Sequence, residues 1–106
     1  MKRYEIRWAN LEPTVGAEMT KTRPAVIVSL DALNRVLETV TICPLTTSLH
    51  PAWRSRVQVT CSGRPAEVVV DQIRAVSKNR LGKKIGSLTL DQAAELRRVI
   101  TEMYGE

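Results

Sequence analysis

Apolar and polar side chains alternate over two segments of the chain. Between residues 3 and 8, Tyr4, Ile6 and Trp8 alternate with charged residues, and residues 56–61 repeat the pattern with an apolar residue at every second position. A period of two is typical of a strand with one buried face. We therefore predict two half-buried strands, with Tyr4, Ile6 and Trp8 facing inward together.

Other segments are continuously apolar or β-branched and predict further strands. Pro24–Ser29 is an unbroken apolar run, as expected for a strand buried on both faces. Thr39–Cys43 is β-branched, and we expect Pro44 to end it. Glu67–Val70 and Ile73–Val76 predict two more strands with a short interruption between them.

Helical signals are fewer. Asp31–Leu37 predicts a short helix, capped by Ser29 or Asp31, with Leu33 and Leu37 on its apolar face.

The end of the chain carries a stronger helical signal. Thr89 and Gln92 form a capping box, and Gly105 ends the predicted helix. The apolar stripe of this helix, which either packs in the core or forms an interface, consists of Ala93, Leu96, Ile100 and Met103. Residues 62–65 predict a turn, and the basic stretch 78–86 predicts a helical turn and a loop.

The elements together predict the fold class. Five or more short strands with one terminal helix are typical of a mainly β domain with short helices, built as a small, strongly bent sheet or barrel. With 106 residues, the chain is expected to form one domain over residues 1–106.

Charge and cysteine content add two expectations. The net charge is +5 at pH 7, which serves either solubility or binding to an acidic partner such as nucleic acid. Cys43 and Cys61 have no metal-ligand spacing, and we expect reduced core thiols in a cytoplasmic protein. No signal peptide or membrane-spanning segment is predicted, and neither a metal nor a cofactor is expected.

Two polar segments flank neighbouring predicted strands. Lys21–Pro24 precedes one buried strand, and Pro44–Ser48 follows the next. An arginine before one strand and hydroxyls after another can meet at one edge of a small sheet. An arginine fork beside hydroxyls on a basic protein is suited to a phosphodiester.

These segments also carry a resemblance to the MazF/PemK toxins, with their CcdB/PemK-like fold. The motifs span nearly the whole chain in the order and spacing of that family. The matching segments are Trp8–Glu18, Lys21–Pro24, Pro44–Ser48, Asp71–Val76, Arg80–Leu81 and Ile85–Gly86.

The resemblance implies a function and an architecture. The family consists of sequence-selective, ribosome-independent endoribonucleases, which are the toxins of type II toxin–antitoxin systems. It implies an SH3-like barrel with a C-terminal helix, acting as a homodimer. Single-stranded RNA, the mRNA substrate, would lie across the dimer interface, and an acidic antitoxin tail would block the same groove.

The sequence departs from one branch of the family. That branch has a histidine where this chain has Ala17, and an arginine where this chain has Val69. The resemblance therefore supports the mechanism built on the first-motif arginine and the second-motif threonine, in which the ribose 2′-hydroxyl attacks the adjacent phosphate without a metal ion and leaves a 2′,3′-cyclic phosphate.

Three residues are the catalytic candidates. Arg23 would hold the phosphate, and Thr46 would bond a phosphate oxygen or relay a proton to the leaving group. Glu18 would accept the 2′-hydroxyl proton or bond a base edge. The alternatives are a surface salt bridge for Arg23, a strand-end backbone contact for Thr46 and a solvated carboxylate for Glu18.

A second set is predicted to contact RNA. Trp53 lies among basic residues, a composition suited to stacking on unpaired bases. The alternative is that its side chain fills space in the core or makes a dimer contact. Gln72 reads a base or makes a structural hydrogen bond, and His50 is expected to be a solvated loop residue. The predicted RNA-binding residues are Lys21, Thr47, Ser48, Trp53, Arg54, Arg56, Gln72 and Arg80.

Two other functions compete with the nuclease. A CcdB-like toxin would use the same barrel to bind a protein target such as gyrase, without catalysis. A plain RNA-binding module would bind RNA in a salt-dependent way and release no product. Substitution of Arg23 by alanine separates the first alternative from the nuclease, because a protein-binding toxin need not lose toxicity.

Overall fold

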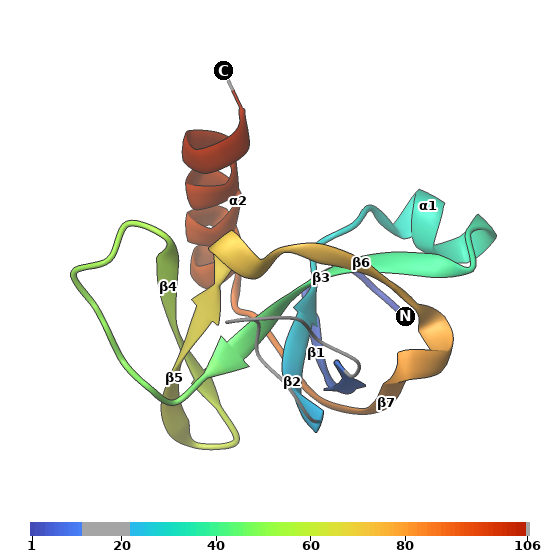
Figure 1. Ribbon diagram of the computed structural model, residues 1–106, viewed down its shortest axis with the longest axis horizontal. Helices are drawn as coiled ribbons and strands as arrows, with labels where there is room; N and C mark the ends of the chain where they lie inside the picture. Colours follow the sequence, from blue (N-terminus) through green and yellow to red (C-terminus); the bar gives the residue numbers. More distant parts are fainter. Residues whose placement is uncertain (12–21, 106) are drawn as a thin grey trace.

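The computed structural model describes residues 1–11 and 22–105. A strongly bent β-sheet holds one long helix on one side and a short helix at the far end (Figure 1). The elements in chain order are β1 (Glu5–Asn10), β2 (Thr22–Ile27), α1 (Asp31–Val36), β3 (Thr39–Thr46), β4 (Arg56–Cys61), β5 (Arg64–Val69), η1 (Val70–Gln72), β6 (Arg74–Ser77), η2 (Lys78–Arg80), β7 (Leu81–Ser87) and α2 (Leu90–Tyr104). The predicted mainly β fold with a C-terminal helix is confirmed.

The sheet is organised around β3. Its strand order is β4-β5-β3-β2-β1-β7, and β6 pairs with β3 outside this path. β2 pairs antiparallel with one edge of β3 from Ile42 to Pro44. On the opposite edge, β6 pairs with residues 39–42 and β5 pairs with Leu45 and Thr46. These pairings are all antiparallel. Because β3 pairs with β2 and β6 along one part of its length and with β5 at its end, it connects the two halves of the bent sheet.

The prediction that Pro44 ends its strand is wrong, because β3 continues to Thr46. The Thr41 carbonyl accepts a bond from Val28 on the β2 side, so strand alternation turns the Pro44 nitrogen toward the opposite edge. On that edge β6 pairing ends at Ile42 and β5 pairing begins at Leu45. A residue without an N–H is accommodated at this junction because no ladder bond is needed there.

Two apolar clusters fill the two faces of the sheet. The larger includes Ile6, Val26 and Val68, and α2 adds Leu96 and Val99 to it. The smaller joins Ala9, Ala25 and Ile27 with residues of β3 and β6. The predicted inward face of residues 56–61 is confirmed for Val57 and Val59, and Cys61 is half-buried.

The predicted C-terminal helix is confirmed as α2. Thr89 and Gln92 form the capping box, and Gly105 ends the helix. Ala93, Leu96 and Val99 are buried against the sheet, while Ile100 and Met103 pack beside them. The stripe of this helix therefore packs in the core of the chain.

The predicted capping and apolar face of α1 are wrong. No side chain caps this helix, and Leu33 is about half exposed. The buried residue is Asn34, which accepts a bond from the Ser29 hydroxyl at 2.6 Å and donates to the Ser29 carbonyl at 3.0 Å. These two bonds turn a polar side of the helix inward and leave the leucines outside.

The stretch 78–86 is only partly a loop. The predicted helical turn is present as η2, but Leu81–Ser87 forms strand β7, which pairs with β1. β7 is an edge strand with much of its length exposed, so it can contain lysines and glycines. These residues are not typical of a strand, and the sequence pattern therefore did not predict one. Its pairing with β1 shifts register twice, which helps the sheet to curve.

Candidate functional site

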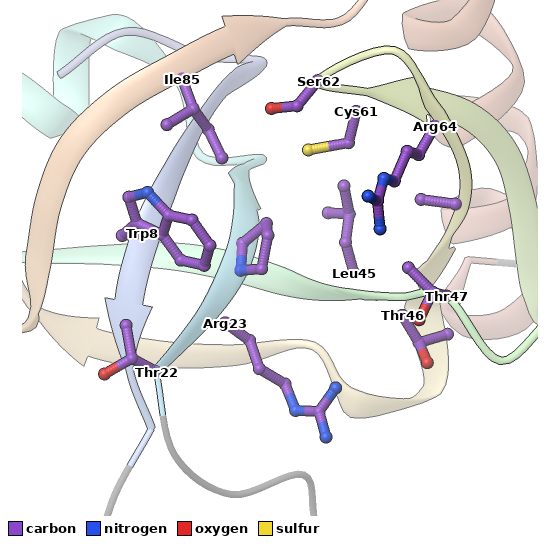
Figure 2. Close-up of a pocket in the computed structure, with 12 residues that line it drawn as sticks. Trp8, Thr22, Arg23, Leu45, Thr46, Thr47, Cys61, Ser62, Arg64 and Ile85 are labelled. Atoms are coloured by element: carbon purple, nitrogen blue, oxygen red, sulfur yellow. The ribbon is translucent and has the colours of Figure 1, made fainter.

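A pocket of about 400 Å³ opens on the concave side of the sheet (Figure 2). It lies between β1 and β2, the end of β3, the β4–β5 hairpin and β7. The lining residues are Trp8, Thr22, Arg23, Pro24, Leu45, Thr46, Thr47, Cys61, Ser62, Arg64, Ala66 and Ile85. The pocket thus has an apolar floor and a rim of hydroxyl and arginine side chains.

Arg23 reaches this pocket from β2. It pairs with Ala9 of β1, and Pro24 follows it opposite Trp8. Because a proline disfavours helical geometry in the preceding residue, Pro24 favours the extended backbone that Arg23 has in β2. In Figure 2 the Arg23 side chain extends toward the side of the pocket where Thr46 and Thr47 lie.

Thr46 is the last residue of β3 and is 9% exposed. Its Oγ1 accepts a hydrogen bond from the Ser48 N–H at 3.1 Å, so the backbone contact considered for this residue is present. A hydroxyl has two lone pairs and one proton, so this bond still leaves the Thr46 proton for donation to another group. Arg23 and Thr46 line one pocket, as the two sequence segments predicted.

Trp8 departs from the predicted alternation. Ile6 is buried, but Trp8 is 42% exposed and lies over the pocket with Pro24 and Ile85. The strand face that is buried at Ile6 opens into the concave pocket two residues later. Sequence reasoning placed Trp8 in the core because a period of two reports which face a residue is on, but not whether that face is covered.

Arg64 was also missed as a pocket residue. It follows a two-residue turn at Ser62 and Gly63, whose φ values of 52° and 78° are those of tight hairpins. Figure 2 shows its side chain directed into the pocket, across from Arg23. The turn was readable in the sequence, but the pairing of β3 with β5 that brings Arg64 near Arg23 was not.

The segment between β3 and β4 carries a stacked cluster. The ring of Trp53 lies 3.8 Å from that of His50, with 6° between the ring planes. The Arg56 guanidinium carbon lies 4.8 Å from the centre of the Trp53 ring. Trp53 is 51% exposed, so it does not plug the core. His50, expected to be solvated, instead stacks and is only partly exposed.

Glu67 of β5 anchors this segment and was not singled out from the sequence. Its side chain is fully buried, and the His50 N–H donates to both of its oxygens, at 2.9 and 3.0 Å. Arg56 Nη1 donates at 2.7 Å and Gln58 Nε2 at 2.8 Å. Burial alone would raise the pKa of the Glu67 carboxyl, but these bonds and the Arg56 charge hold the pKa below its usual range.

A second depression of about 540 Å³ lies between this segment and α2. It is lined by Trp53, Arg54 and Arg56 together with residues of α2. Arg54 forms an ion pair with Glu102 of the helix. Of the predicted RNA-binding residues, Thr47 lines the first hollow, and Trp53, Arg54 and Arg56 line the second.

The remaining predicted residues lie elsewhere. Gln72 is in η1, and Arg80 in η2 donates to the Asn10 carbonyl at 3.3 Å. Glu18 and Lys21 fall outside the described residues. Ser48 contacts Thr46 through its backbone N–H.

Neither a metal-binding cluster nor a membrane-spanning helix is present in the described residues. In residues 1–11 and 22–105, no group of three or more His, Cys, Asp or Glu side chains is placed to hold a metal ion. In the same part of the chain, no helix has the length and apolar character needed to cross a membrane.

Comparison with known proteins places the chain among toxins. The model of the family described as "PemK-like, MazF-like toxin of type II toxin-antitoxin system" matches residues 2–104. Endoribonuclease MazF9 of Mycobacterium tuberculosis is 29% identical over 105 residues, covering 91% of this chain and 89% of the relative. Endoribonuclease MazF of Staphylococcus saprophyticus is 29% identical over 110 residues, with 99% and 92% covered.

Solved structures show the same fold. MazF of Deinococcus radiodurans has a TM-score of 0.86 and 25% identity, covering all of this chain and 97% of the other. An endoribonuclease in complex with its cognate antitoxin, from a mycobacterial species, has a TM-score of 0.83 and 23% identity, with 99% and 95% covered. At these identities the likeness lies in the fold.

Proposed function

This chain belongs to the family of PemK-like, MazF-like toxins of type II toxin–antitoxin systems, and we propose that it is a sequence-selective endoribonuclease that cleaves single-stranded mRNA independently of the ribosome. The observation that carries the proposal is the shared pocket of Arg23 and Thr46. The relatives named as endoribonucleases support the activity. The family match over residues 2–104 supports a single toxin domain.

The proposed reaction is attack of a ribose 2′-hydroxyl on the adjacent phosphate, with loss of the 5′-oxygen of the next nucleotide. Negative charge develops on the phosphate oxygens, and the fixed positive fork of Arg23 is suited to bind two of them. Thr46 donates its hydroxyl proton to a phosphate oxygen or relays a proton to the leaving oxygen. Glu18 is the proposed acceptor of the 2′-hydroxyl proton. The step forms a 2′,3′-cyclic phosphate and needs no metal ion or cofactor.

The RNA is proposed to run from the first pocket toward the stacked cluster. Trp53 is half-exposed and offers an aromatic face to an unpaired base. The net charge of +5 favours binding to the phosphate backbone. The residues proposed for this path are Lys21, Thr47, Ser48, Trp53, Arg54, Arg56, Gln72 and Arg80.

The proposed partners follow from the family. Solved relatives are complexes of MazF with MazE, or of an endoribonuclease with its cognate antitoxin. We infer that an acidic, MazE-like antitoxin segment occupies the Arg23 pocket and excludes RNA. We also propose a cytoplasmic homodimer with the groove across its interface; a monomer in light scattering at working concentration would contradict the dimer.

The proposal is tested with purified protein and a long unstructured RNA. Arg23→Ala and Thr46→Ala should each reduce the cleavage rate by about 100-fold or more, the usual loss when one donor to transition-state charge is removed. Arg23→Lys keeps the charge but loses the fork, and should recover only part of the rate. Arg35→Ala is the matched control, because Arg35 is an exposed arginine of α1, which contributes no residue to the pocket.

Three results would contradict the assignment. Equal cleavage by all variants would indicate a contaminating nuclease. Intact RNA with folded, antitoxin-free protein would point to a protein target, as for a CcdB-like toxin, while salt-dependent binding without product would leave an RNA-binding module.

A further inference from the structure

Glu67 is the fully buried carboxylate for which the proposed chemistry has no use. It stands directly opposite Thr46 in the β3–β5 ladder and directly opposite Gln58 in the β4–β5 ladder. Residues directly opposite each other in antiparallel strands share one face of the sheet. Glu67 therefore lies on the same face as the proposed catalytic threonine, one strand away.

Three hydrogen bonds and the backbone of Ser48 join the two residues. Arg56 Nη1 donates to Glu67 Oε1 at 2.7 Å, and the same nitrogen donates to the Ser48 carbonyl at 3.0 Å. The Ser48 N–H then donates to Thr46 Oγ1 at 3.1 Å. The Ser48 carbonyl and N–H belong to adjacent peptide groups joined at the Ser48 Cα. Glu67 therefore restrains Arg56, Arg56 restrains the backbone at Ser48, and the Ser48 N–H restrains the Thr46 oxygen.

Glu67 also holds the other end of this segment. Its two oxygens accept the His50 N–H, two residues beyond Ser48. Thr46, Ser48 and His50 are consecutive alternate residues, so the turn that follows the catalytic threonine is tied to one buried carboxylate at two points. A side chain held by packing and by bonds from neighbouring groups has fewer orientations available, which is what precise chemistry requires.

The bond from Ser48 determines how Thr46 can act. It occupies one lone pair of Oγ1, and the hydroxyl proton must point away from that donor. The pocket that Thr46 shares with Arg23 offers the space for this donation. We propose that Glu67 is a positioning residue, which acts through Arg56 and Ser48 to aim the Thr46 hydroxyl at the scissile phosphodiester. This inference rests on the proposed nuclease function.

The alternative is that Glu67 only stabilises the fold, and a double-mutant cycle separates the two. Glu67→Gln keeps the size of the side chain but replaces one acceptor with a donor that faces other donors. We expect kcat for RNA cleavage to fall about 10-fold or more, and by a larger factor than KM rises, because Arg23 still binds the phosphate while Arg56, a proposed RNA contact, loses a partner. In the Thr46→Ala background the same substitution should change kcat by less than about twofold, because residues that act as one unit are not additive.

Glu5→Gln is the matched control. Glu5 is also a buried carboxylate held by an arginine, Arg7, at 3.0 Å, but it lies in β1 and lines neither hollow. It should lower stability without changing kcat at a temperature where the variant is folded. If Glu67→Gln does not fold, the same double-mutant cycle is measured with Glu67→Asp, which keeps the charge on a shorter side chain.

Amide hydrogen exchange measures, without RNA, how firmly Glu67 holds the turn at residues 46–50. The Ser48 and His50 amides should exchange at least about 10-fold faster in Glu67→Gln than in the wild type, while the amides of α2 should not differ. A rate of cleavage equal to the wild type despite faster exchange would overturn the positioning role, and so would a fall in kcat that adds fully to that of Thr46→Ala. If the wild type cuts no RNA, the proposed function fails, whereas the exchange data still decide whether Glu67 holds the Thr46 turn.

Discussion

Replacement of Leu96 by alanine tests how α2 is held against the sheet. Leu96 is fully buried, in the same apolar cluster as Val57 and Val68. Leu90 lies in the same helix but is 90% exposed. The two substitutions are chemically identical and differ in burial, so their comparison isolates the contribution of packing.

The expected magnitudes follow from that difference. A buried leucine replaced by alanine loses its transfer free energy and leaves a cavity, which costs about 2–5 kcal/mol. The total stability of a domain of this size is about 5–15 kcal/mol. Leu90→Ala removes almost no buried area and should change stability by less than about 0.5 kcal/mol.

Urea unfolding followed by far-UV circular dichroism measures both effects. With a slope of about 2 kcal/mol/M, a loss of about 3 kcal/mol lowers the Leu96→Ala midpoint by about 1.5 M. The Leu90→Ala midpoint should stay within about 0.3 M of the wild type. All samples need one protein concentration, because a dimer unfolds in a concentration-dependent way. Equal shifts for the two variants would refute the packing of α2 described above.

Three further predictions concern the cap, the carboxylates and the thiols. Thr89→Ala removes the capping box of α2 and should lower the free energy of unfolding by about 0.5–2 kcal/mol in the same assay; an unchanged midpoint would contradict the cap. Burial raises the pKa of the Glu67 and Glu5 carboxyls, but hydrogen bonds and nearby cations outweigh it, so both pKa values are lower in the folded than in the unfolded chain. As the pH falls, the unfolded chain therefore binds protons before the folded chain does. The stability that these carboxylates contribute above the usual carboxyl pKa range should be lost as the pH falls below it. Glu67→Gln should flatten this loss between pH 5 and pH 3 in urea midpoints, and an identical profile would contradict the role of that carboxylate. Burial raises the pKa of the Cys43 thiol to about 12, so iodoacetamide should modify the half-buried Cys61 and spare Cys43 in the native protein, and mass spectrometry showing equal modification would count against it.

Local signals in the sequence were sufficient for several elements. The alternation over residues 56–61 predicted β4 with its correct bounds, and the capping box predicted the start of α2. Both signals are set by neighbours within a few residues. The prediction that Pro44 ends its strand was wrong because the effect of a proline depends on which strand lies at each edge of β3. That pairing is decided by residues far along the chain.

The candidate site shows the same division. The motifs predicted that Arg23 and Thr46 would meet, and the structure places both on one pocket. Trp8 and Arg64 were missed because their roles in the pocket depend on sheet curvature and on the β3–β5 pairing. Glu67 was missed for a related reason: its partners His50, Arg56 and Gln58 come from other segments, and an isolated glutamate in a strand pattern carries no sign of them.

We propose above all that the Arg23 pocket cuts RNA by 2′-hydroxyl attack. The most direct measurement is the chemistry of the new RNA ends, made with purified protein in excess EDTA beside Arg23→Ala and Thr46→Ala. We expect discrete fragments with 2′,3′-cyclic phosphate at their 3′ ends and hydroxyls at their 5′ ends, formed by the wild type and lost in both variants. Fragments with 5′-phosphates, or fragments formed equally by the variants, would contradict it.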